Sequence, residues 1–167
     1  MKRMLMIAVA MLPLVIMAQA RIGIVNSQQL FELMPEKAQA EAQLKTLSEQ
    51  YHSEYMLLQT EFDKKYADYQ TVAVDATMPE TIKERRVQEL QEGDKAIRQF
   101  EQLVAKDIEA QRTKLLEPIK NKVQDAIRAA GEQGGFDLVL DTAVTPVAFI
   151  GPKTIDITPI VKSILGL

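Results

Sequence analysis

Apolar residues in the first half of the chain recur at the spacing of an α-helix. From residue 44 to residue 69 they follow one another at intervals of three or four, in the order 3, 4, 4, 3, 4, 4, 3. This eleven-residue repeat keeps one stripe on one face of a nearly straight helix. Its members are Leu44, Leu47, Tyr51, Tyr55, Leu58, Phe62, Tyr66 and Tyr69. The pattern predicts a long helix that begins near Pro35 and ends near Val74.

A second long helix is predicted over residues 79–130. Its start signal is a capping hydroxyl, a first-turn proline and an acid, supplied by Thr77, Pro79 and Glu80. Gly131 is the predicted stop. The two helices form a hairpin arm over residues 35–131, on the order of 60 to 75 Å long, with its tip near residues 75–80. Because such an arm has no interior of its own, its outer end is expected to be its least stable part.

The apolar stripe of the second helix is poorer over its first half. Its members are Ile82, Leu90, Ile97, Val104, Ile108, Leu115, Ile119, Val123 and Ala126. The same helix face also carries residues that pack poorly between two helices, namely Arg86, Gly93, Glu101 and Arg112. Pro118 lacks an N–H, so a kink or one open hydrogen bond is expected there.

At both ends of the chain the pattern changes to short strands and short helices. Strands are predicted over residues 21–25, 136–141 and 147–151, and short helices after the caps Ser27 and Thr158. The hairpin brings the two ends together, so the opening strand can pair with the closing ones. We therefore predict an α+β fold, with a small β body from residues 21–34 and 132–167 that carries the helical arm.

The predicted body has about 50 residues, near the size at which a single core fails without disulfides, metals or association. The chain has no cysteine and shows no metal-ligand cluster. We therefore expect several copies to join their sheets into a shared barrel-like core. The residues expected in that core are Ile22, Ile24, Phe136, Leu138, Leu140, Val147 and Phe149.

Residues 1–20 have the pattern of a secretory signal. Lys2 and Arg3 precede an apolar run, and Ala18 and Ala20 give the small-x-small form of a cleavage site. A transmembrane anchor needs about 20 apolar residues, whereas this run is shorter and contains Pro13. We predict cleavage after Ala20 and an exported, periplasmic protein. Without cysteine, a lipid-anchored form is excluded.

The net charge of the whole chain is −3, and removal of the signal makes it more negative because two bases and no acid leave. No basic excess remains to neutralise a phosphate backbone, so nucleic acid is not expected as a partner.

Residues that could support catalysis are few. His52 lies in the middle of a predicted helix without a pocket, so a surface histidine is the simpler interpretation. Asp137 and Asp141 could ligate a metal, but they more simply form the polar side of a strand. The sequence GEQGG lacks the lysine of a phosphate-binding loop and precedes a strand. We expect no enzyme, no metal and no cofactor.

Aromatic residues gather toward the outer half of the first long helix. They either form the hairpin seam or, with methionine, offer weakly packed surface suited to varied apolar segments. The candidate binding residues are Tyr55, Met56, Phe62, Tyr66 and Tyr69.

The order of these features resembles the Skp (OmpH-like) family of periplasmic chaperones. The resemblance rests on a signal peptide, RIGIVNSQQLFELMP, a long charged hairpin, and a tail containing FDLVLD and DIT. It implies a jellyfish-like homotrimer whose arms hold unfolded outer-membrane proteins without ATP and prevent their aggregation. It also implies transient contact with membrane surfaces.

The arm departs from this family in its charge. Well-known members are basic, whereas residues 61–100 here carry nine acids against seven bases. We therefore expect client capture to rely more on the aromatic stripe than on electrostatic steering. Two alternatives stay open: an envelope scaffold or spacer that binds one partner, and a subunit that docks to an envelope assembly complex.

Overall fold

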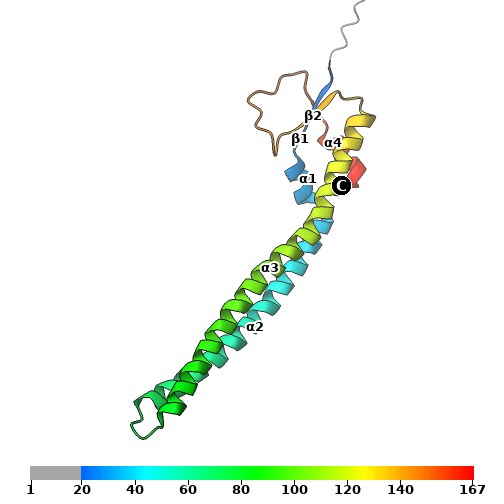
Figure 1. The fold of residues 1–167 in the computed structure, drawn as a ribbon. Coiled ribbons are helices and arrows are strands. Elements are labelled where there is room, and N and C mark those ends of the chain that lie inside the picture. The colour runs from blue at the N-terminus through cyan, green and yellow to red at the C-terminus, as the bar shows by residue number, and fades with distance from the viewer. Residues whose placement is uncertain (1–19) are drawn as a thin grey trace, which may run out of the picture.

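The computed structural model describes residues 20–167, and the predicted signal peptide therefore lies almost wholly outside the described residues. Two long antiparallel helices, α2 (Pro35–Val74) and α3 (Glu80–Gln133), form an arm that extends from a small body at one end (Figure 1). Within residues 20–167, every helix is too short or too polar to cross a membrane. The molecule is an α+β protein, as its pattern predicts.

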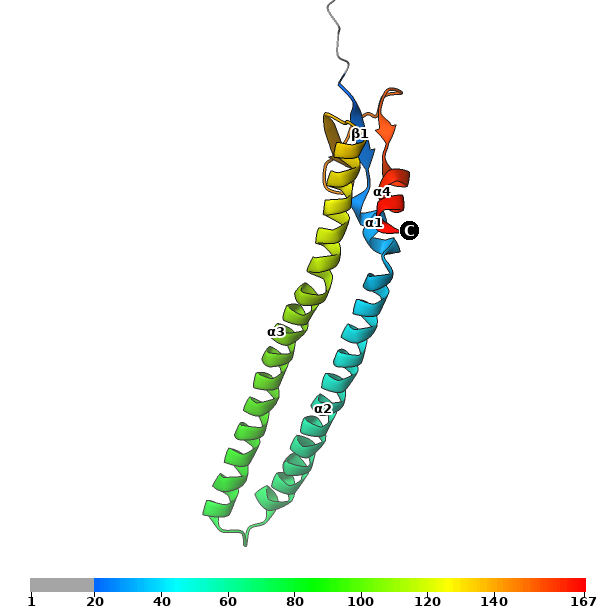
Figure 2. The ribbon, with the colours of Figure 1, turned by 90° about the vertical axis from the view of Figure 1, so that its right-hand side faces the viewer.

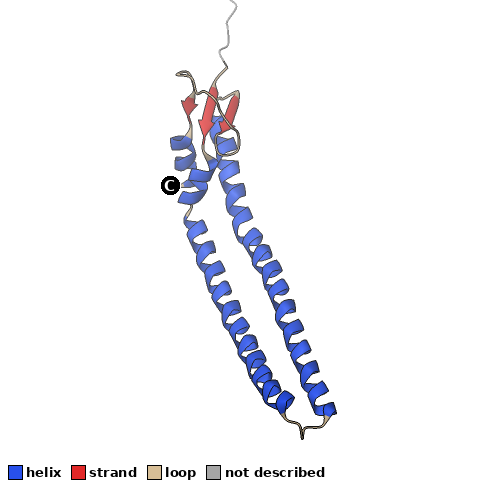
Figure 3. Cartoon of the chain, turned by 90° about the vertical axis from the view of Figure 1, so that its left-hand side faces the viewer, coloured by secondary structure: helices blue, strands red, loops and turns tan. Residues whose placement is uncertain are grey.

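The body contains a three-stranded parallel sheet made from the two ends of the described chain. Strand β1 (Ile22–Val25) lies in the middle, between β2 (Leu138–Asp141) and β3 (Ile155–Asp156). Figure 3 shows these strands together at the base of the arm. The predicted pairing of the opening strand with the closing ones is confirmed.

The third strand is not where its sequence pattern placed it. Residues 147–151 lie in an irregular loop, and β3 comes four residues later. Pro146 and Pro152 flank the predicted segment, and proline cannot donate to a strand ladder. The apolar run between them therefore belongs to a loop, and Asp156 joins the sheet beside Ile24 instead.

Three predicted caps are also wrong. Thr158 is the first residue of α4 (Thr158–Leu165), and Ile157 occupies the cap position. Asn26, and not Ser27, caps α1 (Ser27–Leu33): its side-chain oxygen accepts from the Gln29 N–H at 3.0 Å. At the tip, the Thr77 N–H and hydroxyl both donate to Asp75 Oδ1, at 2.7 and 2.6 Å. Thr77 thus stabilises the turn between the long helices and does not cap α3.

Helix α3 does not stop at Gly131 as predicted. It is unbroken through Pro118, and it runs through Gly131 to Gln133. Gly131 is buried, and a Cβ there would lie 3.4 Å from Val139 of β2. The end of α3 thus packs on the sheet, and the turn itself falls at Gly135, whose φ is +59°.

The hydrophobic core lies entirely at the root of the arm. Buried residues come from β1, α1, the start of α2, the last turns of α3 and the final helix α4 (Thr158–Leu165). Figure 2 shows α4 at the body end of the arm. They are Val25, Leu30, Phe31, Met34, Ala40, Ile119, Val123, Ala126, Ile127, Ala130, Ile157 and Val161. Between Ala40 and Ile119, none of the described hydrophobic side chains is fully buried. The arm therefore has a seam but no core.

Candidate functional site

The outer arm, defined here as residues 61–100, divides the predicted aromatic stripe into buried and exposed members. Tyr55, Phe62 and Tyr69 are half-buried in the seam with α3, whereas Tyr66 is 48% exposed. Lys65 is half-buried instead of Tyr66. Between Phe62 and Tyr69 the seam position can be filled by Lys65 or by Tyr66, because both lie three or four residues from each neighbour. The aliphatic part of the lysine side chain can cover apolar surface while its ammonium group reaches water.

Tyr51 makes a specific contact in the middle of the arm. Its ring meets Phe100 of α3 edge-to-face, with centroids 6.1 Å apart, and its hydroxyl donates to Asp107 Oδ2 at 2.7 Å. This hydrogen bond raises the pKa of Tyr51, because it favours the neutral hydroxyl as donor. Tyr51 therefore joins the two helices, as the seam interpretation of the stripe expects.

Gly93 has a clear place in the seam, although its sequence position suggested poor packing. A Cβ on Gly93 would lie 3.0 Å from Cδ2 of Phe62. The ring of Phe62 thus lies against the backbone of α3 at a point where any larger residue would push it away. Glu101 and Arg112, which the sequence placed on the same line, are exposed.

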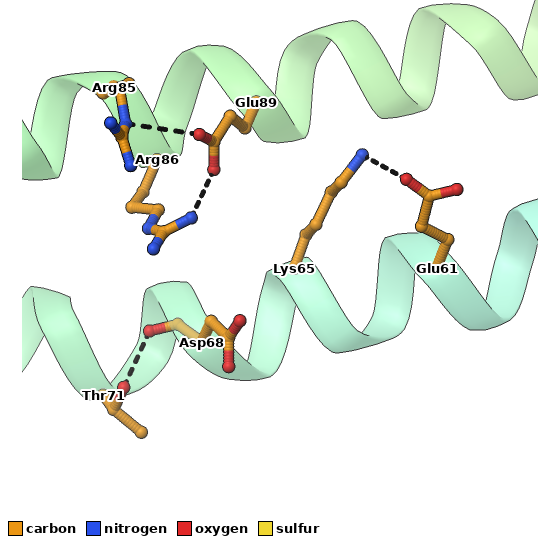
Figure 4. A network of polar contacts seen from close by, with 7 residues as sticks. All are labelled: Glu61, Lys65, Asp68, Thr71, Arg85, Arg86 and Glu89. Atoms are coloured by element: carbon orange, nitrogen blue, oxygen red, sulfur yellow. Dashed lines mark hydrogen bonds and ion pairs between the residues drawn. The ribbon is translucent and has the colours of Figure 1, made fainter.

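Charged side chains fill the seam near the tip. Figure 4 shows Arg86 and Glu89 of α3 facing the stretch of α2 that carries Lys65 and Asp68. Glu89 accepts from Arg86 at 2.7 Å and pairs with Arg85 at 3.3 Å, and Lys65 pairs with Glu61 at 2.7 Å. Among the described residues, Arg86 Nε is enclosed without a hydrogen-bond partner. Each of these ion pairs joins two residues of the same helix, so none of them links α2 to α3. Partly exposed ion pairs also contribute little to stability.

The Arg86–Glu89 pair makes the outer arm sensitive to acid. The hydrogen bond from Arg86 holds the pKa of Glu89 below its usual 4.5. A lowered pKa means that the pair stabilises the folded arm above about pH 4.5, and that this contribution disappears as the pH falls through the folded-state value.

We predict that Glu89→Gln lowers the temperature at which the arm loses helicity at pH 7, and that the difference from the parent shrinks toward pH 4. Thermal melts followed by circular dichroism at both pH values would measure it. Glu92→Gln is the matched control, since Glu92 accepts from the uncharged Gln88. An effect of Glu89→Gln that is independent of pH would contradict the assignment.

Several large apolar side chains on the arm face solvent. Met56 and Leu57 are 45% and 66% exposed, and Val87 and Leu103 on α3 are 37% and 57% exposed. Shallow hollows flank the seam, one near the tip lined by Tyr69, Lys83 and Val87 among others, and one lined by His52, Tyr55 and Val104 among others. Leu57, Val87 and Leu103 are absent from the candidates taken from sequence, which were the aromatic residues of the first long helix and Met56.

A second apolar surface lies on the sheet. The register pairs Ile22 with Leu138 and Ile24 with Leu140, so these four side chains lie together on one face. We call it the sheet face. Ile22 and Leu138 are 36% and 49% exposed. The opposite face packs on the core, where a Cβ on Gly23 would lie 3.0 Å from Ile157.

The other residues expected in the shared core lie elsewhere in the body. Phe136 packs against the hydrophobic core of its own chain. Val147 and Phe149 lie in the loop between β2 and β3, where Phe149 is 81% exposed.

Asp137 and Asp141 join distant parts of the chain. Asp141 Oδ1 accepts from the Ser27 N–H at 3.0 Å, and Asp137 Oδ2 accepts from the Arg21 N–H at 2.7 Å. Within residues 20–167, no cluster of three or more metal-ligating side chains is present. These hydrogen bonds span more than 110 residues of sequence, and no local pattern could have revealed them.

Two antiparallel helices with a half-buried seam, carried on a small parallel sheet with a bare apolar face, define an arm-and-body architecture. The profile of the family described as Outer membrane protein (OmpH-like) matches residues 21–165. The chain belongs to this OmpH-like family.

A solved structure has the same fold. A candidate outer membrane chaperone (OmpH-like) from Caulobacter crescentus superimposes with a TM-score of 0.72 at 22% sequence identity. The alignment covers 89% of this chain and 85% of the other. A search of the curated proteins found no match.

Proposed function

We propose that this protein is an ATP-independent periplasmic holdase that binds unfolded outer-membrane proteins between its helical arms and prevents their aggregation. The observation that carries the proposal is the arm, whose surface exposes Met56, Leu57 and Tyr66 and whose seam near the tip is half-buried and polar. In this proposal the signal peptide is removed after Ala20 and no nucleotide takes part.

Self-association supplies the second part of the proposed mechanism. The sheet face leaves Ile22 and Leu138 substantially exposed on a body whose own core is small. Joining the sheets of several copies into a barrel-like core encloses this apolar face, which removes it from water, and pairs the strand edges. The resemblance to the Skp family implies three copies, whose arms then surround a shared space.

Client binding in this space is proposed to depend on many weak contacts. Methionine and tyrosine side chains adapt to apolar segments of different shape. The polar outer seam lets the helices separate at small cost, so that arms can adjust to clients of different size. Weak, distributed contacts hold a client while leaving it mobile, and release then requires no hydrolysis step.

The decisive experiment is a light-scattering assay in which an unfolded outer-membrane β-barrel protein is diluted from denaturant with and without the chain. We expect suppression of scattering at near-stoichiometric oligomer, without nucleotide. Replacing Met56, Leu57 and Tyr66 together with serine should raise the concentration needed for half suppression several-fold, because the exposed apolar contacts are lost.

The matched control replaces exposed polar residues of the same helix, Glu54, Gln59 and Gln70, with serine. An equal loss in both variants, with helicity unchanged, would show that the apolar side chains do not bind the client. Substitution of Tyr55, Phe62 and Tyr69 tests the seam members of the stripe separately.

The same assay at increasing salt concentration tests how the client is captured. Because residues 61–100 carry slightly more acids than bases, steering should contribute little, and suppression should change little between low and physiological salt. A steep loss of suppression with added salt would show that charge dominates.

The scaffold alternative is favoured by one observation. Tyr51 makes a specific contact with Phe100 and Asp107 in the middle of the arm, as a rigid spacer would need. A spacer predicts a folded oligomer that does not suppress aggregation and that recovers one defined envelope partner. The same assay therefore separates the two functions.

A further inference from the structure

Arg21, the first residue of the predicted mature chain, is fixed by hydrogen bonds to Asp137. The Arg21 N–H donates to Asp137 Oδ2 at 2.7 Å, and the Arg21 carbonyl accepts from the Asp137 N–H at 3.0 Å. These two hydrogen bonds join the same pair of residues in opposite directions. The nitrogen of Arg21 is therefore fixed beside a carboxylate and cannot swing freely.

The side chain of Arg21 adds two further contacts at the end of α3. Its Nη1 donates to the Gly134 carbonyl at 2.6 Å, and its guanidinium lies 4.7 Å from the centre of the Phe136 ring. The C-terminal end of a helix carries unsatisfied carbonyls and partial negative charge, which favours a nearby cation. The surroundings of Arg21 thus suit positive charge on both its side chain and its backbone nitrogen.

We propose that Asp137 is a binding site for the α-ammonium group that signal cleavage creates on Arg21. In the described structure this nitrogen is an amide that stands in for the ammonium. Hydrolysis breaks the C–N bond between Ala20 and Arg21, water supplies the oxygen that makes the Ala20 carboxylate, and the Arg21 nitrogen is protonated. Ala20 is exposed, so the bond is accessible to a peptidase.

Cleavage thereby replaces a neutral hydrogen bond with a charged one at the start of β1. Charge-assisted hydrogen bonds are shorter and stronger than neutral ones. The strand that organises the sheet then becomes more firmly attached to β2 and to the end of α3 when the signal is removed. The proposal rests on the proposed export, and it makes the mature body more stable than the unprocessed one.

The position of cleavage matters in this arrangement. Each residue of extended chain adds about 3.3 Å, so three extra residues would place the ammonium on the order of 10 Å from Asp137. At that distance most of an exposed charge interaction is screened by physiological salt. Only a chain that begins at Arg21 places the new charge against the carboxylate.

The test compares a chain that begins at Arg21 with one that keeps Ala18, Gln19 and Ala20, each with Asp137 and with Asp137→Asn. Asparagine keeps an oxygen that accepts from the Arg21 nitrogen, so the variant removes the charge and leaves the hydrogen bond. The readout is native-state hydrogen exchange of the β1 amides at constant pH. We expect exchange about 2- to 5-fold slower in the chain that begins at Arg21.

This difference should vanish in the two Asp137→Asn chains and persist with Asp125→Asn, a control on the exposed surface of α3. Equal exchange in the two parent chains, or a difference that persists in Asp137→Asn, would overturn the proposal. So would an exported protein whose first residue, determined by mass, is not Arg21. None of these outcomes affects suppression of aggregation, so this inference and the chaperone function fail separately.

Discussion

Replacing Leu138 and Leu140 with glutamate is expected to convert the proposed oligomer into single folded chains. Both side chains lie on the sheet face, and Leu138 is 49% exposed in the single chain. A shared core would enclose a carboxylate at each position in every copy. Removing an unpaired charge from water costs several kcal/mol per group, so association should fail while each body, whose own core lies on the other side of the sheet, stays folded.

Light scattering coupled to size exclusion would measure this change as a fall in mass to that of one chain. The matched control is Leu103→Glu, the same substitution at a leucine that is 57% exposed on the arm. It should leave the mass unchanged. Suppression of client aggregation should be lost with the oligomer, because separate arms enclose no common space. An oligomer of unchanged mass in the Leu138 and Leu140 variant would refute association through the sheet face.

Leu30→Ala is expected to destabilise the body by about 2 to 5 kcal/mol. Leu30 is fully buried in the core cluster that α1 shares with the end of α3 and with α4. Shortening it leaves a cavity that neighbouring side chains from three helices cannot fill without moving. Urea unfolding followed by helicity would show a lower midpoint, and the root of both long helices should fray first.

Leu33→Ala provides the control for this substitution. Leu33 lies on the same helix α1, three residues further on, and is 51% exposed. The same chemical change there should cost less than about 1 kcal/mol. Equal destabilisation of the Leu30→Ala and Leu33→Ala variants would contradict the description of the core at the root of the arm.

The hairpin was predictable because its signal is long and local. Spacings of three and four residues repeat along α2, and Pro35 and Pro79 mark where the long helices begin. Pairing of the terminal strands followed from the hairpin, since antiparallel helices of similar length return the chain to its start. Both inferences depend on local signals, namely the spacing of apolar residues and the prolines that begin the helices.

Predictions that depended on single residues were less successful. Ser27 and Asn26 are both good caps, and only the backbone path shows that Asn26 has the extended conformation of a cap. Residues 147–151 have the composition of a strand, but Ile155 and Asp156 are the residues that reach β1. Short apolar segments near prolines carry too little local information to choose between these outcomes.

For the candidate site, the sequence predicted which helix face forms the seam but did not predict every residue on it. Tyr51, Tyr55 and Phe62 lie in the seam as one interpretation of the stripe expected, whereas Tyr66 is turned outward and Lys65 is half-buried instead. Which of two adjacent residues enters a seam depends on the partner helix. Here Phe62 lies close to Gly93 of α3, where a Cβ would come within 3.0 Å of the Phe62 ring.

The amino-acid sequence by itself determined the helical hairpin, the strands at both ends of the chain and the acidic balance of the arm, because periodicity and charge are properties of neighbouring residues. Tertiary structure alone decided which apolar residues remain exposed, how Arg86 and Glu89 enter the seam, and that Asp137 and Asp141 hold the opening segment. Exposure and seam position depend on how α2 packs against α3. The contacts of Asp137 and Asp141 join residues more than 110 positions apart, and they exist only after the arm has brought the two ends of the chain together.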